Sequence, residues 1–489
     1  MAARTPTLDR TLREHLEHPR GLGVLADAPH TGATGGTACG DLLRVSVRLE
    51  GDRVAEAGFE ARGCAAARAA GSATVELVEE QPLLKAALVT PHAIAAELGG
   101  LSPAGAHAAE LAADALHRAI GLAARDGEAR LRPVANRTLV AMSGGVDSAA
   151  AAQLALDAGD DVVAVTLELW SDPATDGEAS CCSPRAVIGA RALAHRMGIS
   201  HLTLDLRDEF RAAVVDDYLG GYAGGSTPNP CVRCNGLVRF GSMLRLAGDL
   251  GAARLATGHY ARIGDDGHGP LVRAGADPLK DQSYVLARLE GHELARLRFP
   301  LGDLEKPRVR ELARSAGLPV ADRRESQDLC FLAGTGSRAF MRRHGSERLR
   351  AASAGGEIVS RDGEVLGRHA GHHMFTVGQR RGLGVAASEP LYVLAKDAAR
   401  NRVVVGPRAA LAARHVALAP ARLHRPAAAV GSVKLRYHAA AVACRAEPGG
   451  DGDSLALHLD REVAGAAPGQ TACMMRDDLV VGWGTIADA

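Results

Sequence analysis

Within residues 1–130, two runs of alternating hydrophobic and polar positions are followed by segments with a helical pattern. Two strand-like runs, 42–49 and 54–59, are joined by Glu50-Gly51-Asp52, a short polar segment typical of a hairpin turn. Alanine-rich segments at 65–78 and 106–124 then have the pattern of helices. The first region is therefore predicted to be a small α+β domain.

Between residues 136 and 340 short apolar runs alternate with helical segments. The predicted order is strand 139–142, helix from 149, strand 162–167, helix from 184, strand 201–204 and, later, strand 254–257. This order is typical of a doubly wound parallel sheet, in which loops at the carboxyl ends of the strands build the nucleotide site.

After Gly355 the pattern changes to short strands separated by Gly- and Pro-containing turns, at 357–360, 392–394, 402–405 and 479–485. Even spacing of this kind predicts two small β-rich or β-barrel modules. We therefore expect a multidomain protein of α/β and α+β class. Its parts are a first domain at 1–128, a linker at 129–135, an α/β domain at 136–340, a central β-rich domain at 341–412 and a C-terminal β-barrel domain at 413–489.

Composition adds a cellular compartment to this picture. The chain has 489 residues, of which 47% are hydrophobic, yet no stretch approaches the roughly 20 apolar residues of a membrane span. The N-terminus lacks the apolar core of a secretory signal. Nine cysteines in such a chain indicate reduced thiols with chemical roles and not a disulfide framework. We expect a cytoplasmic protein with no membrane partner.

The net charge of zero hides an asymmetry between the two parts of the chain. Residues 1–130 hold 13 of the 57 basic and 17 of the 57 acidic residues, which leaves the remainder with 44 and 40. A nucleic-acid partner would therefore be held by the second part, because phosphate binding needs clustered cations. The segment 291–350 holds 13 basic and 8 acidic residues, a balance that is also common on solvated surfaces.

The first predicted strand of the α/β domain runs into Ser143-Gly144-Gly145-Val146-Asp147-Ser148. The two glycines let the backbone approach an anion, and the N-terminus of the helix that follows presents free N–H groups and a positive dipole end. This loop lacks the lysine of the kinase-type phosphate loop. It resembles the PP-loop of ATP pyrophosphatases, which implies adenylation of a carbonyl oxygen with release of pyrophosphate.

The first domain carries four potential metal ligands at the ends of its predicted elements: Cys39, Asp41, Cys64 and His107. The stretches around them resemble the iron–sulfur scaffold family of IscU and NifU N-terminal domains. Ala108 stands where that family has a cysteine that accepts sulfur from a desulfurase. Two interpretations follow: a metal or cluster site, or a docking module without a cluster.

A second set of thiols lies in the α/β domain, in Thr227-Pro228-Asn229-Pro230-Cys231-Val232-Arg233-Cys234-Asn235. The two prolines predict an extended loop. A Cys-x-x-Cys pair fits a zinc half-site, a redox pair or a cluster half-site, and the lack of a second such pair disfavours a four-cysteine zinc site. The distant partner is Cys330, in the segment 325–331.

With these motifs, residues 136–489 resemble the MnmA family of tRNA-specific 2-thiouridylases. The likeness includes the segments 143–148, 227–235, 256–262, 280–284 and 378–384, Trp170, Arg436-Tyr437 and Pro468-Gly469-Gln470. The resemblance implies ATP-dependent transfer of AMP to O2 of the wobble uridine in tRNAs for Glu, Gln and Lys. Sulfur would then replace the oxygen, with the base flipped out of the anticodon stack.

The resemblance also implies roles for individual residues. Cys330 would carry a persulfide, and Cys234 would assist release of its sulfur, ending in a Cys234–Cys330 disulfide. Mg²⁺ would accompany ATP as a cofactor, and ATP would be bound by Ala141, Met142, Ser143, Gly144, Gly145, Val146, Asp147, Ser148, Leu167 and Gly258. The tRNA would contact Asn229, Pro230, Cys231, His259, Lys280, Asp281, Gln282, Arg436, Tyr437 and Gln470. A cysteine desulfurase or sulfur-relay protein would supply the sulfur, and no DNA partner is expected.

Three alternatives stay open at this point. Cys231, where many relatives carry Asp, would complete a set of three cysteines with Cys234 and Cys330 for a [4Fe–4S] cluster, or it would only tune Cys234. One rival function is an iron–sulfur cluster assembly or sulfur carrier factor with an ATP-pyrophosphatase domain. Another is a carboxylate-activating ligase or amidase, which the paired thiols disfavour.

Overall fold

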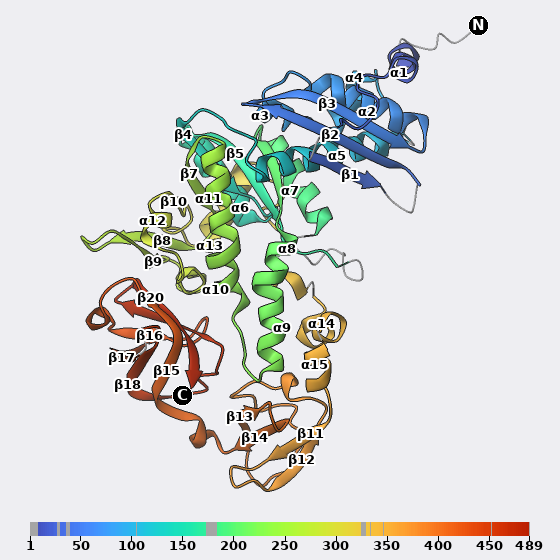
Figure 1. Ribbon diagram of the computed structural model, residues 1–489. Coiled ribbons are helices and arrows are strands. Elements are labelled where there is room, and N and C mark those ends of the chain that lie inside the picture. The colour runs from blue at the N-terminus through green and yellow to red at the C-terminus, as the bar shows by residue number, and fades with distance from the viewer. Residues whose placement is uncertain are drawn as a thin grey trace.

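The computed structural model describes residues 8–26, 30–35, 40–103, 105–172, 183–323, 329–332, 334–345, 347–450 and 452–488. Cys39 and the segment 325–328 of the second thiol motif lie outside these ranges. The molecule is elongated, with the N-terminal unit at one end, the β-rich modules at the other and the α/β domain between them (Figure 1). None of the helices within the described ranges is long and apolar enough to cross a membrane.

The N-terminal unit is a three-stranded antiparallel sheet covered by helices. The strands, in the order β1-β2-β3, are β1 (His30–Gly35), β2 (Leu42–Glu50) and β3 (Arg53–Arg62), and Glu50 pairs with Arg53 across the predicted hairpin turn. The helices are α1 (Leu8–Glu17), α2 (Ala65–Val78), α3 (Leu83–Ala86), α4 (Pro91–Glu97) and α5 (Ala106–Arg125). The predicted strands and both predicted long helices are therefore present.

The α/β domain contains a five-stranded parallel sheet in the order β10-β7-β4-β5-β6. Its strands are β4 (Val134–Ala141), β5 (Asp161–Glu168), β6 (Ser200–Asp205), β7 (Ala252–Thr257) and β10 (Leu297–Arg298). The helices are α6 (Val146–Asp157), α7 (Pro184–Arg196), α8 (Arg207–Phe210), α9 (Asp216–Ala223), α10 (Pro230–Cys234), α11 (Phe240–Asp249), α12 (Gly291–Leu294) and α13 (Lys306–Ser315). The expected doubly wound sheet is confirmed.

Alternate residues of the strands enter different hydrophobic cores, because side chains of a strand point to opposite faces. Val140 packs with residues of α6, α7 and α13, whereas Leu139 packs with residues of α11 and α5. Helix α5 belongs to the N-terminal unit, yet it lies against β6, where Gly121 allows close contact: a Cβ there would lie 2.1 Å from the Thr203 carbonyl oxygen. The N-terminal unit thus supplies a covering helix of the parallel sheet.

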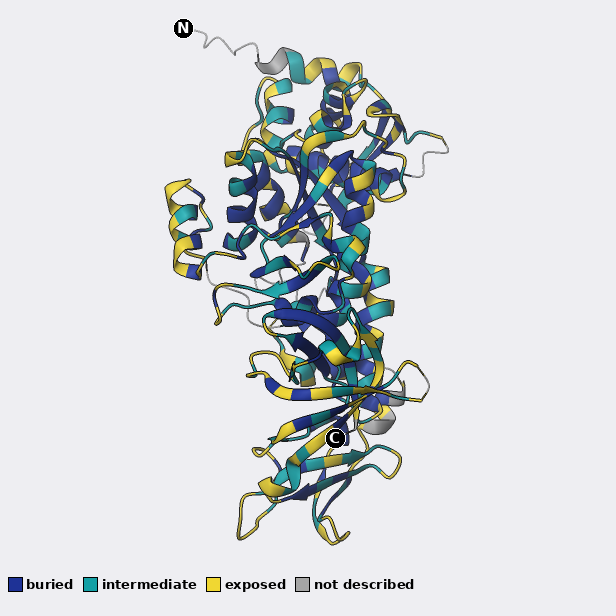
Figure 2. Cartoon of the chain, turned by 90° about the vertical axis from the view of Figure 1, so that its left-hand side faces the viewer, coloured by how far each residue is buried: buried dark blue, intermediate teal, exposed yellow. Residues whose placement is uncertain are grey.

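Polar contacts fix the same interface. Arg118 of α5 lies 3.5 Å from Glu168 at the end of β5, and Arg191 of α7 lies 3.0 Å from Asp114 of α5. The connecting segment is also held, since the Leu131 amide donates to the Asp249 carbonyl at 2.9 Å. Buried strands and helices continue from one unit into the other in Figure 2. The N-terminal unit is therefore docked in a fixed position and not loosely tethered.

Two short helices, α14 (Gly336–His344) and α15 (Glu347–Ala352), lead into a central four-stranded sheet of order β12-β11-β14-β13. Its strands are β11 (Gly356–Val359), β12 (Val365–His369), β13 (Tyr392–Asp397) and β14 (Arg402–Gly406). The last module is built from β15 (Ala412–Leu423), β16 (Ser432–Lys434), β17 (Val442–Pro448), β18 (Leu455–Ala464), β19 (Thr471–Arg476) and β20 (Leu479–Asp488).

Pairing of β15 with β20 closes these six strands into a barrel. The hairpin of β8 (Ala261–Asp265) and β9 (Pro270–Ala274) continues the barrel sheet beside β20, which joins the barrel to the α/β domain. The prediction of two β-rich modules after the α/β domain is confirmed.

Candidate active site

The carboxyl ends of β4, β5 and β7 surround a cavity of about 210 Å³. Seven residues predicted to bind ATP line it: Ala141, Met142, Ser143, Asp147, Ser148, Leu167 and Gly258. Gly144, Gly145 and Val146 belong to the same loop but do not line the cavity, which is completed by Val165, Thr166, Arg239, Met243, Thr257, His259 and Gln282. His259 and Gln282, predicted as tRNA contacts, thus lie in the wall of the nucleotide cavity.

The loop between β4 and α6 is closed by its own hydroxyl groups. The Ser143 amide donates to Ser148 Oγ at 3.1 Å, and that hydroxyl donates to the Gly145 carbonyl at 3.0 Å. Gly144 has a φ of 73°, which favours glycine. A Cβ on Gly258 would lie 2.7 Å from the Asp147 carbonyl carbon, so only glycine lets β7 approach the loop. Helix α6 begins at Val146, three residues earlier than predicted, so Asp147 lies in its first turn.

Asp147 is held by two residues that the sequence did not single out. Lys306 Nζ, at the start of α13, lies 2.7 and 2.8 Å from the two carboxylate oxygens, and the Tyr260 hydroxyl donates to Oδ1 at 2.7 Å. Arg323 donates from Nη1 to the Gly144 carbonyl at 3.1 Å. The ammonium group compensates the negative charge that an acidic residue brings to a phosphate-binding loop.

The segment with Cys231 and Cys234 is helical, so the prediction of an extended loop is wrong. Asn229 is the N-cap of α10 and accepts from the Val232 amide at 3.3 Å, and Pro230 occupies the first turn, where its missing N–H costs nothing. Cys231 is exposed and Cys234 is buried. The cap residue and the proline thus start a helix that carries both thiols.

Helix α10 continues into a π-helical segment, Asn235–Arg239, and then into α11. A π-helical turn brings residues five positions apart together, and the guanidinium of Arg239 lies near enough to the Cys234 thiol for its charge to act on it. Burial raises the pKa of the Cys234 thiol well above its usual value, while the charge of Arg239 opposes that shift and the thiols of Cys330 and Cys231 add to it. Burial and the charge of Arg239 also lower the pKa of His259 to about 3.

Cys330 begins a short 3₁₀ turn, Cys330–Leu332, and is partly buried against the same core as Cys234. The turn is anchored by Phe331, whose ring centroid lies 5.1 Å from that of Tyr218 and 4.9 Å from that of Phe340. Packing against one core thus brings Cys330 to the thiol-bearing helix, although Cys330 follows Cys234 by 96 positions in sequence.

The predicted tRNA contacts fall into an outward group, which is at least partly exposed to solvent, and an inward group, which is bonded to other residues of the protein. Lys280 is partly exposed and Arg436 and Tyr437 are exposed. Asp281 is paired with Lys434 at 2.8 Å, and Gln470 donates to the Thr227 carbonyl at 2.8 Å. The inward group shapes the segment that leads into α10, since Asn229 Nδ2 also donates to the Tyr284 hydroxyl at 3.3 Å.

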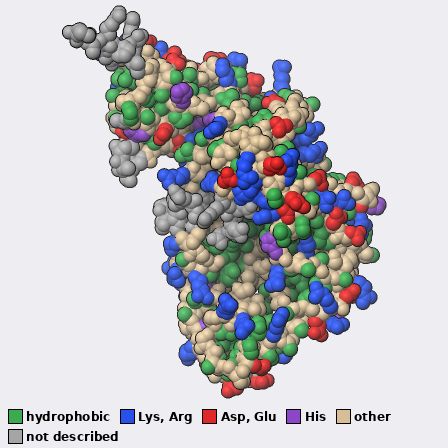
Figure 3. Space-filling model, turned by 180° about the vertical axis from the view of Figure 1, so that it is seen from behind, with side chains coloured by type: hydrophobic (Ala, Val, Ile, Leu, Met, Phe, Trp, Pro, Cys, Tyr) green, Lys and Arg blue, Asp and Glu red, His purple; other side chains and the backbone are tan. Residues whose placement is uncertain are grey.

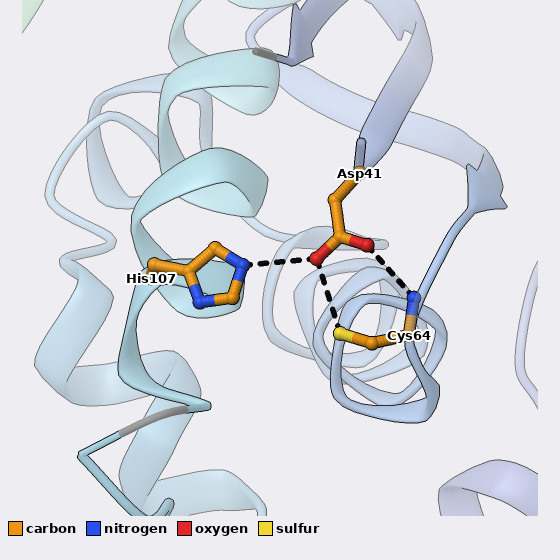
Figure 4. Close-up of side chains that lie close together, drawn as sticks. All are labelled: Asp41, Cys64 and His107. Carbon is orange, nitrogen blue, oxygen red and sulfur yellow. Dashed lines mark hydrogen bonds and ion pairs between the residues drawn. The ribbon is translucent and has the colours of Figure 1, made fainter. Parts of the chain in front are cut away.

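A third group of functional side chains lies in the N-terminal unit (Figure 4). Asp41 Oδ2 lies 2.9 Å from His107 Nε2 and accepts from the Cys64 thiol at 3.1 Å, while Oδ1 accepts from the Cys64 amide at 2.8 Å. The bonds from Cys64 and His107 lower the pKa of Asp41. The three ligand atoms lie within 4.8 Å of one another, as a metal site requires. Ala108 is fully buried.

Fold and sites together define a nucleotide-binding α/β enzyme with adjacent thiols, joined to a scaffold-like unit and two β modules. Four family models match in that order: a NifU-like N-terminal domain at 9–125, a tRNA methyl transferase HUP domain at 136–334, a tRNA methyl transferase PRC-barrel domain at 347–407 and an aminomethyltransferase β-barrel domain at 419–486.

A bifunctional protein NifU/MnmA of Rubrobacter xylanophilus is 44% identical to this chain over 97% of both sequences. The tRNA-specific 2-thiouridylase MnmA of Magnetococcus marinus is 42% identical over 72% of this chain and 98% of its own length, and that of Chloroflexus aurantiacus is 44% identical over 71% and 98%. The chain belongs to the family of bifunctional NifU/MnmA proteins, as the resemblance predicted.

Proposed function

We propose that this protein converts the wobble uridine of tRNA to 2-thiouridine, with ATP as the activating substrate. Its relatives named tRNA-specific 2-thiouridylase support this function over that of a pure assembly factor. The observation that carries the proposal is Arg239, which lines the nucleotide cavity and lies near enough to the Cys234 thiol for its charge to act on it. A single side chain thus joins the site for activation to the site for sulfur delivery.

In the first step the loop at 143–148 holds the phosphates of ATP at the N-terminus of α6. The uracil O2 attacks the α-phosphate, the bond to the β-phosphate breaks and pyrophosphate leaves, which makes the oxygen part of an AMP leaving group. Mg²⁺ would offset the charge of the phosphates, with Asp147 as its candidate ligand. Lys306 and Tyr260 orient that carboxylate.

In the second step sulfur replaces the activated oxygen. The terminal sulfur of a persulfide on Cys330 attacks C2 of the adenylated base, and AMP leaves with the oxygen. Cys234 then attacks the sulfur of Cys330, the persulfide bond breaks, and the electron pair forms the thiocarbonyl of the product. A Cys234–Cys330 disulfide remains, which a thiol reductant must reopen before the next turnover.

The base must leave the anticodon stack to reach these groups. Asn229, Pro230 and Cys231, at the start of α10, are the proposed walls of its pocket, and Lys280, Arg436 and Tyr437 are proposed contacts to the rest of the tRNA. Lys and Arg side chains lie along the middle and lower parts of the molecule on the face shown in Figure 3. The N-terminal unit, with its net charge of −4, is not expected to bind RNA.

A second route is the one in which Cys231, Cys234 and Cys330 would hold a [4Fe–4S] cluster with one iron open to sulfide. Substitution Cys231→Ser separates the two routes. A persulfide relay keeps most of its thiolation activity in this variant, whereas a cluster route loses it together with the bound iron, measured by absorption and metal analysis after anaerobic purification.

The N-terminal unit is proposed to supply or dock sulfur or a cluster for the α/β domain. Because the unit is packed on the sheet, the test uses a point variant instead of a deletion. Cys64→Ser should lower thiolation when a cysteine desulfurase and cysteine provide the sulfur, and should leave thiolation by excess free sulfide unchanged. Equal loss with both sources would contradict this role.

The activation step has a direct test. With ATP, Mg²⁺ and unmodified tRNA, Cys234→Ser should release pyrophosphate and accumulate adenylated tRNA, because it cannot complete sulfur transfer. Asp147→Asn should release it at a strongly reduced but measurable rate. Pyrophosphate release that does not depend on tRNA would refute tRNA as the activated substrate.

A further inference from the structure

A second cavity of about 210 Å³ lies between the α/β domain and the C-terminal barrel. Its wall comes from α9 and α10, from the segment 226–229 and from the barrel, where Gly469, Thr471, Trp483 and Thr485 contribute. Of the residues given roles above, only Asn229 also lines this cavity, and Gln470 lies between two of its lining residues.

Arg288 is the principal cation of this cavity. Its guanidinium carbon lies 3.9 Å from the centre of the Trp483 ring, so the group is stacked on the indole face. The stem passes over Gly236, where a Cβ would lie 2.6 Å from the Cβ of Arg288. The glycine and the tryptophan therefore hold the guanidinium in one orientation, with its N–H edge available to a ligand.

The cavity wall holds two arginines, Arg288 and Arg233, and one carboxylate, Asp217, whose charge partly offsets theirs. No acidic side chain in the described ranges forms an ion pair with it, and Asp217 is already paired with Arg233 at 3.4 Å. Burial and the nearby charge of Arg233 lower the pKa of Arg288 to about 10. The guanidinium still carries its charge at neutral pH, so the cavity has an excess of positive charge that an anion would relieve.

We propose that Arg288, supported by Arg233, binds a backbone phosphate of the tRNA beside the nucleotide that is flipped into the active site. The cavity is smaller than the roughly 300–1,000 Å³ of pockets that enclose drug-sized ligands, so it suits a phosphate group better than a whole nucleotide. Guanidinium groups bind phosphate through two parallel hydrogen bonds, and stacking on an aromatic ring leaves those donors free.

This phosphate site would also connect tRNA binding to the thiols. Arg233 lies between Cys231 and Cys234 on α10, and its Nε donates to the Ala213 carbonyl. A phosphate bound by Arg288 and Arg233 therefore contacts the helix that carries both cysteines. The inference rests on the proposed tRNA substrate, and it adds a positioning site that selects the register of the RNA backbone.

The experiment measures the affinity of an anticodon stem–loop RNA as a function of salt, for the full-length protein. Substitution Arg288→Gln should weaken binding about tenfold, the effect of removing one hydrogen-bonded charge contact, and should reduce the slope of log K against log salt by about 0.7–0.9. Arg288→Lys should keep most of the slope. Arg53→Gln in the N-terminal unit, where Arg53 is paired with Glu80 at 3.8 Å, is the charge-matched control and should change neither quantity.

Trp483 provides an independent signal, because the chain has only two tryptophans. Trp170→Phe removes the other one, whose buried indole N–H has no hydrogen-bond partner in the described structure. In that background RNA binding should change the emission of Trp483. A single uncharged methylphosphonate linkage can also be placed at each phosphate of the RNA loop in turn. At the phosphate that Arg288 binds, it should weaken binding to the wild type and have no further effect on binding to Arg288→Gln.

The results of these binding experiments distinguish failure of the proposed function from failure of the phosphate site. If the wild type does not bind the RNA, the proposed function fails. If the wild type binds it and Arg288→Gln has unchanged affinity and salt slope, the phosphate site fails alone. The site is also refuted if Arg288→Gln impairs only sulfur transfer from a desulfurase, since the cavity would then serve a protein contact.

Discussion

Substitution Lys306→Met tests the claim that an ion pair holds Asp147 in place for ATP activation. The pair joins two atoms at 2.7 Å, and the side chains of Lys306 and Asp147 are 9% and 31% exposed. At this distance two charges attract by about 6 kcal/mol at an effective dielectric constant of about 20, and by about 1.5 kcal/mol in bulk water. Because the carboxylate is partly exposed, we expect a loss of about 3 kcal/mol, which corresponds to about 150-fold in kcat/KM for AMP transfer.

The assay is tRNA-dependent release of pyrophosphate, measured at saturating tRNA with ATP and Mg²⁺ varied. Arg425→Met is the matched control, since Arg425 and Asp266 form a similarly buried pair at 2.8 Å away from the nucleotide cavity. The control should lower the melting temperature without changing KM for ATP. The double variant Asp147→Asn, Lys306→Met should be no worse than Asp147→Asn alone, because both changes remove one interaction.

Two results would refute this reasoning. One is a Lys306→Met protein whose AMP transfer stays within threefold of the wild type. The other is a double variant whose defect is the product of the two single defects, since that would mean that the residues act independently.

Three further predictions concern the thiols and the domain interface. With a cysteine desulfurase and cysteine as the sulfur source, Cys330→Ser should abolish 2-thiouridine formation while pyrophosphate release continues, and the double variant with Cys234→Ser should be no worse; thiolation near the wild-type rate by either variant would disprove the relay. Burial raises the pKa of the Cys234 thiol, so its thiolate fraction should grow with pH. Single-turnover sulfur transfer should therefore accelerate from pH 7 to 9, with AMP transfer measured as the control. A sulfur-transfer rate that does not change with pH would exclude Cys234 as the attacking thiol. Deletion of residues 1–130 should give aggregated protein by light scattering, because it exposes Leu202 and Leu204, which are buried under α5; a soluble monomer with wild-type melting temperature would contradict the shared core.

The sequence predicted the elements whose pattern is local. Strand and helix periods identified β2, β3, α2 and α5 of the N-terminal unit and the parallel strands of the α/β domain. It failed at α10, because two prolines suggested an extended loop. Asn229 as a cap and Pro230 in the first helical turn were in fact the signal for a helix start.

The sequence also contained a signal for the fixed docking of the N-terminal unit. Helix α5 is buried nearly all round, from Ala108 to Ala124, and its charged residues in that range form a single stripe at Glu110, Asp114 and Arg118. So wide an apolar surface must be covered on more than one side. A small three-stranded sheet covers only one side of such a helix. The other side required a partner, which the structure identifies as the sheet edge at β6.

The residues around Asp147 depended on long-range folding. Lys306 follows Asp147 by 159 positions, and no local pattern links them. Composition offered one signal, since Lys306 is one of only five lysines among 57 basic residues. A lysine in a chain that otherwise uses arginine favours a specific role. No sequence pattern predicted Arg239 as a site residue, because its position near Cys234 depends on a π-helical segment that no sequence period indicates.

The central claim is that this chain places sulfur on tRNA by using ATP, and one measurement tests it most directly. Purified full-length protein is incubated with an unmodified glutamate tRNA transcript, ATP, Mg²⁺, a cysteine desulfurase with cysteine as the sulfur source, and a thiol reductant, and the nucleosides are analysed by mass spectrometry. The account predicts 2-thiouridine at the wobble position only, formed with ATP and absent when an α,β-methylene analogue, which cannot release pyrophosphate, replaces it. Thionucleoside that forms without ATP, at another position, or not at all would contradict the account.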